Sequence, residues 1–162
     1  MPIWTPSIWD WALAAYALPG VPEACLALQD EHGQNTSLLL WAVYAEARDP
    51  AMLARGAEAA RAWDATALKP LREVRRALKP ALPPFPDGAR QALREEVKGL
   101  ELAAERLLLE TLAGLCGAPR RASGGAPALE ALEAASQAWD KPAPPAALAA
   151  LAAALAQDPR SA

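Results

Sequence analysis

Residues 87–116 read DGARQALREEVKGLELAAERLLLETLAGLC and contain no proline. Apolar residues recur in this stretch at intervals of three and four, the spacing that gathers them on one face of an α-helix. Asp87 precedes the first apolar residues, where its carboxylate is suited to cap the helix. The stretch therefore predicts one long helix, and its apolar face comprises Leu93, Val97, Leu100, Ala104, Leu107, Leu108, Leu112 and Leu115.

A proline-rich corner, Pro83-Pro84-Phe85-Pro86, comes directly before this helix. On its other side, residues 71–82 carry apolar side chains at helical spacing and predict a shorter helix. Because prolines end helices and turn the chain, we expect the two helices to form an antiparallel hairpin. Lys69-Pro70 predicts a break or kink between the shorter helix and the one before it.

Helix boundaries are also marked toward the N-terminus. Ser7 is suited to cap a helix that runs to about residue 18, and Pro22 favours the start of a second helix over 21–31. Asn35 would cap a third helix, and Asp49-Pro50 would start a fourth. The third contains the segment Leu38–Tyr44, which is apolar nearly all round and therefore predicts a central position. Gly56, inside the fourth, suggests a close approach of another group to the backbone.

The composition agrees with a folded, all-α chain. Of the 162 residues, 53% are hydrophobic and 22% are charged, which is enough apolar surface for one core. No window alternates apolar and polar residues as a half-buried strand requires. The net charge of −3 argues against a protein that covers nucleic acid with a basic surface. We therefore expect no nucleic-acid partner.

We expect two regions in the chain. Residues 4–117 predict a compact bundle of about six helices. Residues 118–162 contain the linker-like stretches 123–127 and 141–145, rich in proline, glycine and alanine, and predict a flexible tail with one or two short helices. Within that tail, the Ala/Leu run 146–156 has only small residues and leucines to bury, so we expect it to dock loosely.

The N-terminus carries no basic region followed by a long apolar run, and no stretch reaches the roughly 20 apolar residues that span a bilayer. We expect a cytoplasmic protein without a membrane span. Two cysteines, Cys25 and Cys116, and one histidine, His32, lack the spacing of a zinc site. The cysteines are interpreted as buried, reduced thiols, and no metal or cofactor is expected.

Charge is distributed unevenly along the chain. Residues 1–66 hold eight acidic and three basic side chains, whereas residues 67–121 hold seven acidic and eleven basic ones. The basic excess centres on Lys69 and on a stripe of four residues of the shorter hairpin helix, Arg72, Arg75, Arg76 and Lys79. Two interpretations remain open. The arginines either pair with Glu101 and Glu105 of the long helix and fix the hairpin, or they form a site for a phosphate or carboxylate.

Two further polar residues, Gln29 and Asn35, border the most apolar segment, where a polar side chain needs a partner. Asn35 has one if it caps the third helix, whereas the sequence assigns none to Gln29. Together with Glu101 and Glu105, they are expected to form a structural polar network. The serines lack a nucleophile elbow, and no glycine loop for phosphate is present, so no catalytic residue is predicted.

Two segments resemble a family of small uncharacterised proteobacterial proteins. The first comprises Trp9, Tyr16-Ala17, Pro19-Gly20-Val21, residues 24–30, Gly33, Asn35 and residues 38–40. The second comprises Trp63, Pro70-Leu71-Arg72, Arg75-Arg76, Leu78-Lys79 and residues 101–105. The similarity covers about residues 4–116. It implies a shared helical domain and supplies no catalytic residue.

The leading hypothesis is a non-enzymatic binding or adaptor protein that uses the tail to contact a protein partner. It depends on the missing catalytic constellation and on short apolar helices between linkers. The alternative hypothesis is a protein, or a degenerate enzyme, that binds a small anionic ligand at Arg72, Arg75, Arg76 and Lys79.

Overall fold

The computed structural model describes residues 6–116 and 127–157, which form helices and no strand. The expected all-α architecture is thereby confirmed. In chain order the elements are α1 (Ile8–Tyr16), α2 (Val21–Asp30), α3 (Thr36–Tyr44), α4 (Pro50–Trp63), the π-helical segment η1 (Asp64–Leu68), α5 (Lys69–Ala77), α6 (Asp87–Cys116), α7 (Ala128–Trp139) and α8 (Pro145–Leu155).

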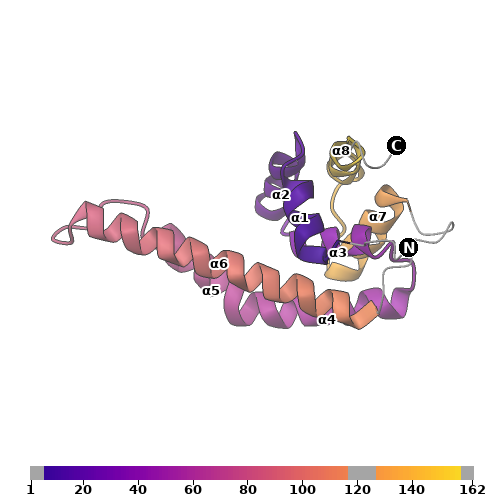
Figure 1. Ribbon diagram of the computed structural model, residues 1–162, viewed down its shortest axis with the longest axis horizontal. Helices are drawn as coiled ribbons and strands as arrows, with labels where there is room; N and C mark the ends of the chain where they lie inside the picture. Colours follow the sequence, from indigo (N-terminus) through magenta and orange to yellow (C-terminus); the bar gives the residue numbers. More distant parts are fainter. Residues whose placement is uncertain (1–5, 117–126, 158–162) are drawn as a thin grey trace.

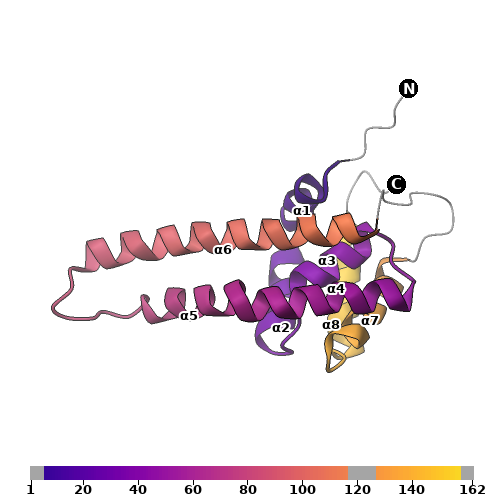
Figure 2. The ribbon, with the colours of Figure 1, turned by 90° about the horizontal axis from the view of Figure 1, so that it is seen from below.

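The molecule has a head and a projecting hairpin. The head consists of α1, α2, α3, α7 and α8, gathered at one end of the hairpin (Figure 1). In the hairpin, α4, η1 and α5 run in one direction, and α6 returns beside them (Figure 2). The ends of α5 and α6 that flank the turn extend beyond the head (Figure 2).

The core is centred on α3, as its uniformly apolar sequence predicts. Its residues from Thr36 to Ala42 are all buried, and Asn35 caps the helix by accepting a hydrogen bond from the Leu38 N–H at 2.9 Å. Trp41 is completely buried and lies against Gly56 of α4. A Cβ atom at Gly56 would lie only 2.5 Å from Cζ3 of Trp41, so the expected close approach is real.

Of the break or kink expected at Lys69-Pro70, the break is wrong. Residues 50–77 form one continuous helical run that widens to a π-helix over Asp64–Leu68. The Lys69 N–H donates to the Asp64 carbonyl, five residues back. A proline normally clashes with the carbonyl four residues before it, and the wider turn accommodates its ring without ending the helix.

The shorter hairpin helix ends earlier than residue 82. It stops at Ala77. Pro80 follows closely, and a proline disfavours the helical conformation at the residue before it, here Lys79. Residues 78–86 then form the turn at the tip of the hairpin, in which the Pro83–Pro84 peptide bond is cis.

The two C-terminal helices belong to the same core as the rest of the head, which corrects the expected loose docking of residues 146–156. Leu132 of α7 and Leu151 of α8 are fully buried, and Leu148 is nearly so. α7 packs on α3 and α4, and α8 packs on α2 and α7. Their alanines allow close helix approach, so small residues and leucines suffice for tight docking. Residues 117–126 lie outside the described residues.

Within the described ranges, no single helix combines the length and the apolar character that a membrane crossing requires. α1 and α2 together reach that length and composition, but they meet at an angle of 100°.

Candidate functional site

The arginines of α5 face carboxylates of the long helix. Arg75 donates from Nε to Oε2 of Glu101 at 2.6 Å, and its Nη2 lies 3.4 Å from Oε1. Arg72 forms an ion pair with the same carboxylate at 3.5 Å and donates from Nη1 to Asp64 at 3.1 Å. Glu101 is buried, with 9% of its surface exposed. This is the pairing expected if the stripe fixes the hairpin.

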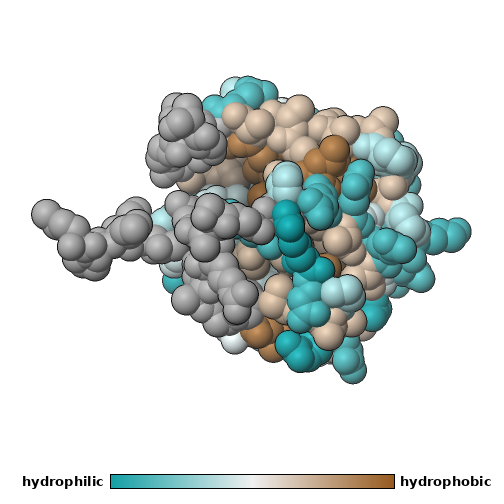
Figure 3. All heavy atoms as spheres, turned by 90° about the vertical axis from the view of Figure 1, so that its right-hand side faces the viewer, coloured by the Kyte–Doolittle hydropathy of each residue, from teal (hydrophilic) through white to brown (hydrophobic). Residues whose placement is uncertain are grey.

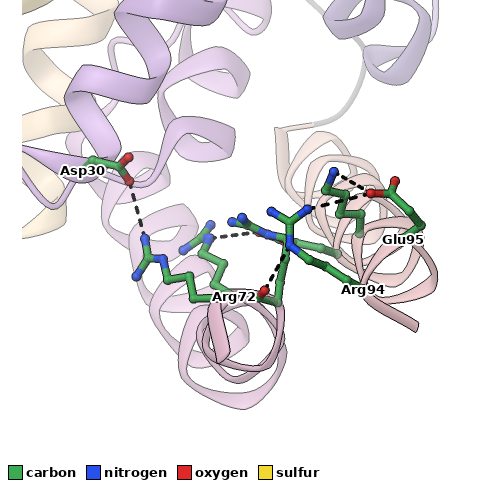
Figure 4. A network of polar contacts seen from close by, with 8 residues as sticks. Asp30, Arg72, Arg94 and Glu95 are labelled. Carbon is green, nitrogen blue, oxygen red and sulfur yellow. Dashed lines mark hydrogen bonds and ion pairs between the residues drawn. The ribbon is translucent and has the colours of Figure 1, made fainter. Parts of the chain in front are cut away.

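The other two residues of the stripe point elsewhere. Arg76 is exposed and forms an ion pair with Asp30 of α2 at 3.6 Å, which links the hairpin to the head. Lys79 is exposed in the turn after α5. Figure 4 follows the contacts from Asp30 past Arg72 to Arg94 and Glu95 on α6. The stripe therefore divides among three surroundings and does not converge on one point.

A second cluster of polar groups lies where the head meets α6. Burial raises the pKa of Glu105, although the positive charges of Arg72 and Arg75 oppose the shift. Burial also raises the pKa of the Cys25 thiol to about 11. The Tyr16 hydroxyl contacts Cys25 and Thr36, and burial raises its pKa as well, even though part of the residue is exposed.

The raised pKa of Cys25 bears on whether this thiol can act as a nucleophile. A nucleophilic cysteine needs a lowered pKa, whereas Cys25 keeps its proton at neutral pH. Glu101 and Glu105 lie one helical turn apart on α6. Neither of them lines the polar cleft that lies between the end of α2 and the η1–α5 region. Among the described residues, no cluster of histidines, cysteines and carboxylates fits a metal ion.

A polar cleft of about 340 Å³ lies between the end of α2 and the η1–α5 region. Three of its lining side chains are basic, namely Lys69, Arg72 and Arg76. Three are acidic, namely Asp30, Asp64 and Glu73, so the walls carry no net charge. Gln29, Gly33, Gln34 and Trp139 complete the lining. Arg75 and Lys79 are not part of it.

The buried polar network between head helices depends on Gln34, which the sequence analysis did not single out. Gln34 donates to the Lys141 carbonyl at 2.8 Å and accepts from Ser136 at 2.9 Å. Ser136 is fully buried and accepts from the Ala143 N–H at 2.8 Å. Gln34 is about a hundred residues away from Ser136 and Lys141 in the sequence, so no local signal identifies these contacts.

The residues predicted for that network have different surroundings. Gln29 is half-buried and lines the polar cleft, to which Gln34 also contributes. Asn35 is buried and caps α3, and its Nδ2 lacks a hydrogen-bond acceptor within the described part of the chain. Glu101 and Glu105 belong to the hairpin and its junction with the head. The four residues therefore do not form one network.

The tip of the hairpin is a further candidate that the sequence analysis treated only as a corner. Phe85 is 64% exposed and Leu82 is 52% exposed, at the end of the molecule farthest from the head (Figure 1). Behind them Arg90 is buried and donates to the Leu78 carbonyl at 2.6 Å, to the Lys79 carbonyl at 2.8 Å and to Asp87 at 2.9 Å. The tip thus presents apolar side chains from a loop fixed by a buried arginine.

A family model described as "Protein of unknown function (DUF2390)" matches residues 7–112. The chain belongs to this family. The match includes α1 to α5 and most of α6, and thus both of the antiparallel helical segments that form the hairpin. No curated protein and no solved structure matches the chain.

Proposed function

We propose that this DUF2390 protein is a non-enzymatic, cytoplasmic binding protein that contacts a protein partner through the tip of its hairpin. The observation that carries the proposal is the exposure of Phe85 and Leu82 on a turn held by Arg90. Large side chains that fill a pocket supply most of the energy of many protein interfaces, with aromatic residues prominent among them.

The fixed turn favours such a contact. The hydrogen bonds of Arg90 tie both ends of the loop to α6, so less conformational freedom is lost when a partner binds. The apolar faces of α7 and α8, which were the expected contact surface, are occupied by α2, α3 and α4. Viewed from the head end, hydrophobic side chains are interrupted by hydrophilic ones (Figure 3).

The chemistry of the partner follows from the charge of the outer hairpin. Residues 69–98 carry eight basic and four acidic side chains. A complementary partner offers an apolar pocket for Phe85 with carboxylates around its rim. Such a rim would hasten association and confer specificity.

The test compares two variants of the full chain, Phe85→Ser and Leu26→Ser. Leu26 is 59% exposed on α2 and serves as a control for loss of an exposed apolar side chain on the head. Each immobilised protein is incubated with extract of the source cells, and a retained protein is purified and titrated against all three chains. We expect Phe85→Ser to raise the dissociation constant about 30-fold or more, as loss of an aromatic hot spot does.

Equal retention by Phe85→Ser and the natural chain would refute the proposal. Equal weakening by Leu26→Ser would refute it as well, because the tip would then have no special role. Retention of no protein at all counts against it too.

Anion binding is a second candidate, favoured by the cleft that contains Lys69, Arg72 and Arg76. The three carboxylates on the same walls oppose it, since they neutralise the cations. If the cleft binds anions, millimolar inorganic phosphate raises the melting temperature of the natural chain. A Lys69→Gln variant then shows a smaller rise, and an unchanged melting temperature of the natural chain excludes this function.

A further inference from the structure

The hairpin has two faces, and one of them is open. The face with Arg72, Arg75 and Glu101 is turned toward the head, where Arg76 reaches Asp30. Figure 2 looks onto the opposite face, on which α4, α5 and α6 lie in front of the head helices. We call this surface the open face.

Large apolar side chains line the open face. Leu93, Leu100 and Leu107 follow one another at intervals of seven residues, so they form a ridge along one side of α6. They are 50%, 58% and 51% exposed. Val74 stands two residues after Arg72, which directs it to the opposite side of α5, and it is 47% exposed.

Beside this leucine ridge lies an apolar hollow. It has a volume of about 290 Å³ and lies between α4, η1 and α6. On the α4 and η1 side its lining side chains include the small residues Ala59, Ala62 and Thr66. On the α6 side it is lined by Leu107, Leu108 and Thr111. A ridge and a hollow on one surface are what a self-complementary contact requires, because each copy inserts its ridge into the hollow of the other.

We propose that the open face binds a second copy of this chain in antiparallel orientation, so that two hairpins form a four-helix bundle. In a hairpin of two helices, one side of the apolar stripe on each helix is exposed to water. The hairpin of a second copy covers that side. The contact is independent of the proposed partner at the tip, which stays at the outer end of each hairpin.

The size of the open face agrees with a stable dimer. α6 has 30 residues, which gives a length of about 45 Å at 1.5 Å per residue. Two helices packed side by side are about 18 Å wide, from an interaxial distance of about 9 Å and the radius of each helix. The product is about 800 Å² per copy, the area that each partner contributes to a standard specific interface.

The overall charge of the hairpin, counted over both of its faces, favours the antiparallel orientation. The outer hairpin, residues 69–98, has eight basic and four acidic side chains. The inner part, residues 50–66 and 99–116, has three basic and five acidic ones. Antiparallel hairpins place the basic outer part of each copy against the acidic inner part of the other. Parallel hairpins would place the two basic outer parts together.

The test measures the mass of the full chain in solution by light scattering after size-exclusion chromatography. We expect twice the chain mass of 17.1 kDa for the natural protein. Leu100→Glu, in the centre of the ridge, is expected to give the monomer mass. The matched control is Leu102→Glu, because Leu102 is 50% exposed on another side of the same helix, and it is expected to remain a dimer. Circular dichroism of each variant establishes that it is folded.

A natural chain that is monomeric at about 100 μM would overturn the proposal, as would a Leu100→Glu dimer or an equal effect of Leu102→Glu. The orientation is tested with pyrene attached to Phe85→Cys in a Cys116→Ser background. Antiparallel hairpins hold the two tips far apart and give no excimer emission, whereas excimer emission of the dimer contradicts that orientation. Phe85→Ser leaves the mass unchanged, so failure of the partner contact and failure of the dimer are distinguishable.

Discussion

Replacing Gly56 by alanine places a methyl group against the buried indole of Trp41. The new Cβ would lie 2.5 Å from Cζ3 and 2.7 Å from Cη2, whereas ordinary contacts begin near 3.4 Å. Either the ring or the helix must therefore move by about 1 Å, and Trp41 has no exposed side toward which to move. Overpacking costs about 1 to 3 kcal/mol, and an overlap of about 1 Å with a ring that has no room to move belongs to the upper part of that range, about 2 to 3 kcal/mol. Alanine regains about 1 kcal/mol of helix propensity.

The net expectation for Gly56→Ala is a loss of about 1 to 2 kcal/mol, which lowers the melting temperature of a chain of this length by about 2 to 8 °C. The matched control is Gly99→Ala in α6, because no heavy atom lies within 4 Å of a Cβ at that position. It is expected to raise the melting temperature by about 2 to 4 °C. Circular dichroism melting measures both changes. A Gly56→Ala variant as stable as the natural chain would refute the reasoning.

Three other perturbations have defined outcomes. Ser136→Ala leaves two buried partners, one of them the Ala143 N–H, without a hydrogen bond, and the urea midpoint should fall by the equivalent of about 2 kcal/mol or more. In the folded state the pKa of Glu105 is raised above its ordinary value of 4.5. Between these two pKa values the folded chain binds more protons than the unfolded chain, so the free energy of unfolding decreases as the pH rises through this range. Glu105→Gln lacks this loss, and its melting temperature relative to the natural chain should increase from about pH 5 to pH 7. In a Cys116→Ser background, Cys25 should react with a disulfide reagent at pH 8 only after urea unfolds the chain, because it is buried and its pKa is about 11; rapid reaction of the folded protein would contradict this.

Local signals in the sequence predict the helix ends well. Ser7, Asn35 and Asp49 each accept a hydrogen bond from a backbone N–H in the first turn of the helix that follows. A capping side chain and its N–H partner are only two or three residues apart, so the sequence displays them together. The prediction of a break at Pro70 was wrong for the opposite reason. A π-helical turn depends on a hydrogen-bond geometry that cannot be inferred from the types of residues in it.

Long-range contacts were harder to predict. The pairing of Arg75 with Glu101 was accessible because a single turn joins the two helices and an arginine side chain is long enough to bridge the offset between their positions along the hairpin. Gln34 and Ser136 meet across about a hundred residues, and nothing near either residue indicates the other. The docking of α8 on α2 is of the same kind.

The pairing of α2 with α8 also affects how the chain folds during its synthesis. During synthesis α2, which contains the buried residues Val21 and Leu28, emerges from the ribosome well before α8, so it lacks this packing partner until the last helix has been translated. The hairpin, by contrast, brings together residues that are near in sequence and can assemble first. A nascent chain released just after α6 would therefore have a folded hairpin and an incomplete head that lacks α7 and α8. Chaperones and proteases recognise such partly folded chains.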